Sequence, residues 1–62
     1  MHRFTLYGLG RDNQVLATEQ LSVEGAEEAR RIARERLGEY PKVELWQASV
    51  CLYRRSRTQP TP

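Results

Sequence analysis

The first third of the chain alternates between apolar and polar residues, the pattern of β-strands with one buried face. In residues 3–7, Phe4 and Leu6 fall on one face and the intervening side chains fall on the other. Residues 14–21 resume a strand pattern. The segment between them, residues 8–13, holds two Gly, one Asp and one Asn, which tolerate turn conformations. The pattern therefore predicts an antiparallel hairpin.

The second predicted strand carries one acidic residue on its apolar face. Val15, Ala17 and Leu21 share that face by alternation, and Glu19 interrupts it. A charged side chain is costly among buried apolar ones. We therefore expect the strand to bulge or end near Glu19.

Residues 23–37 have the spacing of an amphipathic helix. Ser22 is the predicted N-cap, Gly38 the predicted left-handed C-cap, and Pro41 prevents continuation. The apolar stripe is formed by Ala26, Ala29, Ile32, Ala33 and Leu37. Because three of its five members are Ala, the helix is expected to lie close on a sheet.

The last apolar part of the chain predicts one or two further strands. Residues 43–46 read as a strand, 47–49 as a tight turn and 50–53 as a last strand, although one long strand over 43–53 remains an alternative. The predicted fold is α+β: a small antiparallel sheet of three to four strands with one helix packed on one face, ββαβ or ββαββ. The expected strand order is 2-1-3-4.

The charge distribution divides the chain into a domain and a tail. Residues 1–53 carry seven basic and eight acidic residues, a net charge of −1, whereas residues 54–62 carry three Arg and no acid, a net charge of +3. We therefore expect a single domain over 1–53 and a disordered basic tail over 54–62.

The small size of the chain predicts self-association. Chains below about 70 residues usually need disulfides, a metal or a partner to reach useful stability. One Cys and one His in 62 residues exclude an internal disulfide and a structural zinc site, so a homodimer is the expected supplement. No signal-peptide pattern and no membrane-length apolar run is present, and a single Cys fits a reducing compartment, so a cytoplasmic location without membrane contact is expected.

The order of these segments resembles a family of very small proteobacterial proteins, a domain of unknown function whose last hairpin reads "VEVWQG". The resemblance covers nearly all of residues 3–54, and its most specific part is Val43 to Gln47. The chain departs from the family pattern at Ala48-Ser49, where the family tends to have Gly. The resemblance implies the ββαββ fold and no activity.

No residue pattern predicts an enzyme or a cofactor. The Gly-x-Gly of residues 8–10 lacks a third Gly and is followed by a strand instead of a helix, so it predicts a turn and no phosphate site. Cys51 is a candidate nucleophile only with a base nearby, and the one His, His2, lies at the chain terminus. We therefore expect a non-enzymatic binding protein with no catalytic, cofactor-binding or metal-binding residues.

The uncovered sheet face is the predicted binding surface. Tyr7, Trp46 and Tyr53 are expected to share it, either at a dimer or protein interface or as stacking platforms for single-stranded RNA. Possible phosphate or acidic-partner contacts are Arg3, Arg54, Arg55 and Arg57. The homodimer is the principal hypothesis, RNA binding is the alternative, and a phage- or plasmid-type inhibitor of a host protein is a third.

Overall fold

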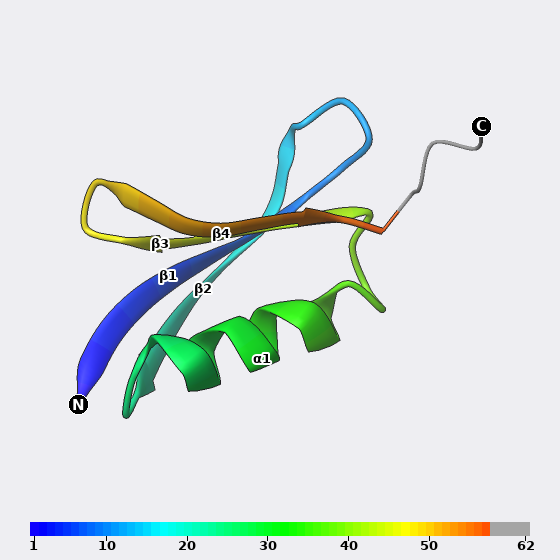
Figure 1. Cartoon of the computed structure of the whole chain (residues 1–62). Coiled ribbons are helices and arrows are strands. Elements are labelled where there is room, and N and C mark those ends of the chain that lie inside the picture. Colours follow the sequence, from blue (N-terminus) through cyan, green and yellow to red (C-terminus); the bar gives the residue numbers. More distant parts are fainter. Residues whose placement is uncertain (58–62) are drawn as a thin grey trace.

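A computed structural model describes residues 1–57 as one four-stranded antiparallel sheet with a single helix across one face (Figure 1). The elements in chain order are β1 (His2–Leu9), β2 (Val15–Val23), α1 (Ala26–Arg36), β3 (Lys42–Gln47) and β4 (Val50–Ser56). The strand order β2-β1-β3-β4 is the predicted one. The α+β class is confirmed, and residues 43–53 form a hairpin, which excludes the one-strand alternative.

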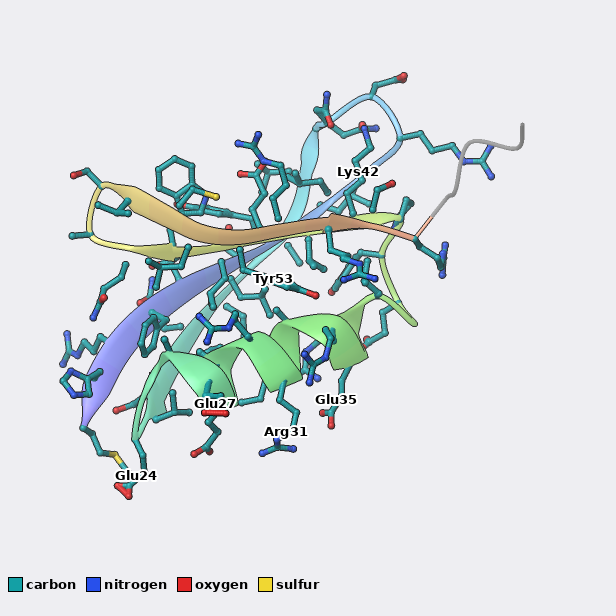
Figure 2. All side chains as sticks on the ribbon, viewed as in Figure 1. Glu24, Glu27, Arg31, Glu35, Lys42 and Tyr53 are labelled. Carbon is teal, nitrogen blue, oxygen red and sulfur yellow. The ribbon has the colours of Figure 1, made fainter. Side chains whose placement is uncertain are left out.

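The core lies between α1 and the sheet. Leu6 of β1 and Val43 and Leu45 of β3 are fully buried there. Ala29 and Ala33 meet them from the helix and have no exposed surface, so the predicted Ala-rich stripe does allow a close approach. The opposite side of α1 is charged, with side chains directed away from the sheet (Figure 2).

Both predicted helix caps are wrong. Ser22 lies inside β2, because Val23 is buried in the core and pairs with His2, which extends the strand past the predicted cap. The helix begins later, with Gly25 as its N-cap. At the other end no described glycine has positive φ, so Gly38 is no left-handed cap. The helix instead tightens into i,i+3 bonds, such as Gly38 N–H to Glu35 O at 3.2 Å.

A β-bulge reshapes the first hairpin. Gly8 pairs with Ala17 but Leu9 pairs with Val15, so Leu16 is an extra residue in β2. A bulge bends the strand and increases its twist. Val15 is thereby moved to the face opposite the one that simple alternation predicts. Figure 1 shows the β1–β2 turn rising on the side of the sheet away from α1.

The predicted irregularity at Glu19 does not occur there. Glu19 pairs in register with Leu6, and its carboxylate receives two hydrogen bonds from Arg36 at the end of α1: Nη2 to Oε1 at 2.7 Å and Nε to Oε2 at 3.0 Å. The bidentate pair lets an acidic residue occupy the helix-covered face without interrupting the strand. It also ties the end of the helix to the edge strand.

The Glu19–Arg36 pair makes folding stability depend on acidic pH. The hydrogen bonds and the positive charge of Arg36 lower the pKa of Glu19 from its usual 4.5, against a smaller opposing effect of burial. The lowered pKa stabilises the fold above about pH 4.5, and this stabilisation is lost as the pH falls through the folded-state pKa. Because both side chains are about a third exposed, solvent screening limits the expected cost of Glu19→Gln at pH 7 to about 0.5–1 kcal/mol.

Urea denaturation of wild type and Glu19→Gln at pH 7 and at pH 3 measures this effect. The two proteins are expected to differ at pH 7, and the difference is expected to be smaller at pH 3. An equal difference at both values would show that the carboxylate charge is not what stabilises this contact.

The C-terminal strand is longer than predicted, so the predicted tail does not begin at Arg54. β4 continues to Ser56, and the next residue is still bonded: Arg57 N–H donates to Pro41 O at 2.8 Å, and Arg57 Nη1 donates to Leu37 O at 3.1 Å. These contacts also satisfy a carbonyl at the end of α1. The remainder of the predicted tail, residues 58–62, lies outside the described residues.

Candidate functional site

Two of the three predicted aromatic residues, Tyr7 and Trp46, lie on the sheet face opposite α1. Trp46 of β3 lies opposite Thr5 of β1 on one side and Cys51 of β4 on the other. Tyr7 lies two residues further along β1, opposite Glu44, so by alternation it points to the same face as Thr5. Since residues paired across antiparallel strands point to the same face, these five side chains share the face that α1 leaves uncovered. We call it the open face.

The third predicted aromatic residue, Tyr53, is on the other face. Trp46 pairs with Cys51 and Leu45 pairs with Tyr53, so Leu52 is an extra residue in β4. This second bulge breaks the alternation and turns Tyr53 toward α1, beside the core (Figure 2). The prediction that Tyr53 shares a face with Trp46 is wrong for this reason.

The position of Tyr53 predicts an unusual result for a small substitution. Its hydroxyl is buried and has no hydrogen-bond partner among the described residues. A buried unpaired polar group costs about 1–3 kcal/mol. We therefore expect Tyr53→Phe to leave the free energy of unfolding unchanged or to raise it by up to about 1 kcal/mol. Chemical denaturation of the two proteins checks this, and a loss of stability would mean that the hydroxyl does have a partner.

Glu44 organises the centre of the open face. Its Oε1 accepts a hydrogen bond from Trp46 Nε1 at 2.9 Å, and its Oε2 lies 3.2 Å from Arg54 Nε. The carboxylate side chain is only 21% exposed. The Trp46 ring and the Arg54 side chain are therefore held by one acid, and the indole N–H is not available to an external ligand.

The open face has a hollow of about 570 Å³ beside Tyr7 and Trp46. Residues from β1, β2 and β3 and from the β3–β4 turn line it. They are Tyr7, Leu9, Asn13, Val15, Glu44, Trp46, Ala48 and Ser49. A second hollow of about 640 Å³ adjoins it and shares Leu9, Asn13 and Glu44 with it. The second hollow also reaches Val43, Arg55 and Ser56 beside the end of β4. We call the two adjoining hollows the groove; its end at Tyr7 and Trp46 is apolar and aromatic.

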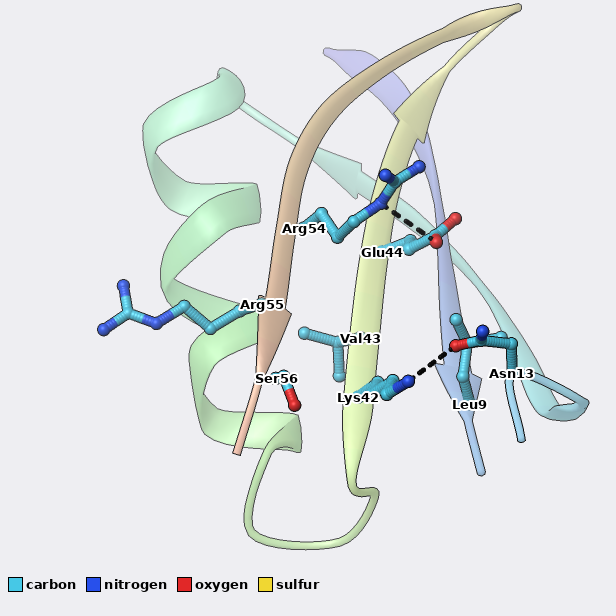
Figure 3. Close-up of a pocket in the computed structure, with 8 residues that line it drawn as sticks. All are labelled: Leu9, Asn13, Lys42, Val43, Glu44, Arg54, Arg55 and Ser56. Carbon is cyan, nitrogen blue, oxygen red and sulfur yellow. Dashed lines mark hydrogen bonds and ion pairs between the residues drawn. The ribbon is translucent and has the colours of Figure 1, made fainter. Parts of the chain in front are cut away.

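The other end of the groove is polar and charged (Figure 3). There Lys42 Nζ donates a hydrogen bond to Asn13 Oδ1 at 2.8 Å, and Arg54 contacts Glu44. The Lys42–Asn13 bond joins β3 to the raised β1–β2 turn. Leu9 is buried beneath that turn, at 5% exposure, although it lies outside the main core cluster. The groove therefore has a fixed wall and an apolar floor.

The four arginines predicted to act together are divided between different places. Arg54 lies on the open face with Glu44, and Arg3 belongs to the same face by its register in β1. Arg55 pairs with Val43 and points to the opposite side of the sheet (Figure 3). Arg57 is engaged with carbonyls at the end of α1. Lys42 lines the groove but was not predicted as a site residue. Strand alternation would have placed it on the same face as Glu44 and Trp46.

Within residues 1–57, no three His, Cys, Asp or Glu side chains gather into a group able to hold a metal ion. Cys51 is a free, half-buried thiol beside Trp46, and its Sγ lies 3.6 Å from Tyr53 O. In the same residues no helix has the length and apolar character needed to span a membrane. The main feature of the open face is therefore its two adjoining hollows.

Comparison with family models, with curated proteins and with solved structures finds no match for this chain.

Proposed function

We propose that this protein acts by binding and without catalysis, as a homodimer whose interface is the open face. The observation that carries the proposal is the groove beside Trp46, on a sheet face that α1 leaves uncovered. Trp and Tyr are enriched at protein interfaces because they are large, rigid and amphipathic. Tyr7 and Trp46 supply such side chains here.

The size of the domain supports a second copy as the partner. The one-sided core contains two Ala from the helix, and no disulfide reinforces it. A small core of this kind gives limited stability. Covering the open face with another copy buries additional apolar surface, including the exposed part of the half-buried Trp46 side chain.

The arrangement of charges favours a protein partner over single-stranded RNA. Glu44 lies at the middle of the groove, where a phosphate backbone would have to pass. Arg55 is on the other face and Arg57 is engaged elsewhere, so neither adds a phosphate contact on the open face. Three basic residues on the open face, Arg3, Lys42 and Arg54, could still contact phosphates, so RNA binding remains the alternative.

Sedimentation equilibrium tests the proposal on the full chain. Wild type is expected to show a concentration-dependent monomer–dimer equilibrium. Trp46→Ala is expected to shift it by at least about tenfold toward monomer, because central aromatic residues dominate binding energy. Tyr53→Phe is the control, an aromatic change on the covered face, and is expected to dimerise like wild type. Circular dichroism of each variant verifies that it is folded.

Two results would overturn the homodimer. One is a monomer at all concentrations up to the millimolar range. The other is saturable quenching of Trp46 fluorescence by random-sequence single-stranded RNA, weaker at physiological than at low salt, since such salt dependence is the mark of phosphate contacts. That result would assign the open face to nucleic acid. A protein that remains monomeric would instead be consistent with the third hypothesis, an inhibitor of a host protein.

A further inference from the structure

We infer that the two copies interlock, with the β1–β2 hairpin end of each seated in the groove of the other. The hairpin end is here residues 10–16. This inference rests on the proposed homodimer and specifies how its two open faces meet. It would make the hairpin end, which carries no conspicuous chemistry, the principal specificity element of the protein.

The shape of the open face is the first argument. A groove placed against an identical groove leaves a void, so two such faces do not pack if they are only hollow. The β1–β2 turn rises on the side of the sheet away from α1 (Figure 1). Asn13 of this turn lines both hollows, so the hairpin end borders the groove. A ridge beside a groove is self-complementary under two-fold rotation, because the ridge of each copy meets the groove of the other.

The distribution of exposed apolar side chains is the second argument. Val15 and Leu16 are 57% and 53% exposed. They are adjacent in the chain, at the start of β2, where the bulge places them. The apolar end of the groove, with Tyr7 and Trp46, offers a surface of matching chemistry. Burying these two aliphatic side chains against that surface removes apolar area from water and so favours association.

The polar ends of the two surfaces are also compatible. The tip of the hairpin carries Arg11 and Asp12, both exposed, one of each sign. The polar end of the groove likewise presents both signs, with Glu44 beside Lys42 and Arg54. Opposite charges can therefore be matched in an interlocked dimer, which favours one register over others.

The hairpin is rigid enough to act in this way. Gly10 N–H donates to Gln14 O at 2.9 Å and Asn13 N–H donates to Gly10 O at 3.0 Å, which closes the turn. Asn13 has φ of 65°, a left-handed conformation that Asn tolerates. The bond from Lys42 to Asn13 then anchors the turn to the sheet. A pre-ordered element loses little entropy on binding.

A matched pair of substitutions tests the inference. Leu16→Asp places a charge on the hairpin end without altering the residues that line the groove. Val50→Asp is the control, since Val50 is equally exposed at 56% but lies on the β3–β4 hairpin, outside both hollows. In sedimentation equilibrium, Leu16→Asp is expected to raise the dimer dissociation constant by at least about tenfold, and Val50→Asp by less than about twofold.

Intermolecular fluorescence quenching gives a second readout, which reports how close the hairpin end of one copy lies to Trp46 of the other within the dimer. One copy carries a nitroxide on Asp12→Cys, together with Cys51→Ser and Trp46→Phe, so it contributes no Trp signal. Mixed with unlabelled wild type, it is expected to quench Trp46 of the other copy. The same label on Glu27→Cys, on the exposed side of α1, is expected to leave that signal unchanged.

The outcomes separate this inference from the proposed function. A monomeric wild type overturns both. A wild-type dimer that Trp46→Ala weakens, but that Leu16→Asp and the Asp12 label leave unaffected, supports the open-face dimer and overturns the interlock. A dimer that none of these changes affects would use a surface other than the open face and overturn both. Loss of dimer in Leu16→Asp together with quenching by the Asp12 label supports the interlock.

Discussion

Replacing Leu45 by Ala is expected to abolish most of the stability of the fold. Leu45 has no exposed surface and lies at the middle of β3, between Leu6 of β1 and Tyr53 of β4. Truncating a buried Leu costs about 2–5 kcal/mol, because contacts are lost and a cavity remains. A domain of this size has a total stability of only about 3–5 kcal/mol. The variant is therefore expected to be largely unfolded at 37 °C.

Thermal denaturation followed by circular dichroism measures this effect. Leu16→Ala is the matched control, the same chemical change at a side chain that is 53% exposed, and is expected to change the free energy of unfolding of the monomer by less than about 0.5 kcal/mol. Both proteins are compared at a concentration where wild type is monomeric, because dimerisation stabilises the fold by mass action. Equal losses at the two positions would contradict the placement of the core.

Replacing Gly8 by Ala is expected to cost about 1–3 kcal/mol, the range for overpacking in a filled site. Gly8 lies inside β1, where Gly is usually unfavourable, and the reason is the ring of Tyr40. A Cβ on Gly8 would lie 2.6 Å from Tyr40 Cδ2 and 2.7 Å from Cγ. Because Cγ is next to the backbone, the ring cannot swing aside as the end of a flexible chain does. Either β1 or the segment after α1 has to shift.

The partner residue supplies a strict test. In a double-mutant cycle, Tyr40→Ala removes the ring, so adding Gly8→Ala is expected to cost much less in that background than in wild type. Gly25→Ala is the control, since a Cβ there meets no atom within 4 Å and φ is extended at −170°. Additive effects at positions 8 and 40 would show that the ring does not determine the requirement for Gly.

The sequence predicted the helix and strands well, but it predicted less well which face of the sheet each residue occupies. The alternation around Phe4 and Leu6 and the helical stripe around Ala29 and Ala33 predicted the right elements and the right core. The face of an individual residue was predicted correctly only where the alternation is unbroken, as at Trp46. A bulge inserts one residue without any local signal in the apolar pattern.

The candidate site shows how an unpredicted bulge changes which residues share a face. Tyr7 and Trp46 were placed correctly on the open face, whereas the bulge at Leu52 removed Tyr53 from it. The predicted tail failed for a related reason. Arg54 to Arg57 have no apolar residue among them, so composition indicated disorder, but the hydrogen bonds of β3 and of the carbonyls after α1 hold them in place. Such partners are distant in sequence.

By itself, the sequence determined the type and order of the elements and left open only whether residues 43–53 form one strand or two. Hydrophobic periodicity is a local property, and a one-sided sheet must bury its apolar face against the predicted helix. Only the tertiary structure decided which side chains share the open face, how the hairpin bends over the groove, and that Glu19 is matched by Arg36. Each of these depends on register and on pairs of residues far apart in the chain. Their energies become available only when the whole sheet has formed.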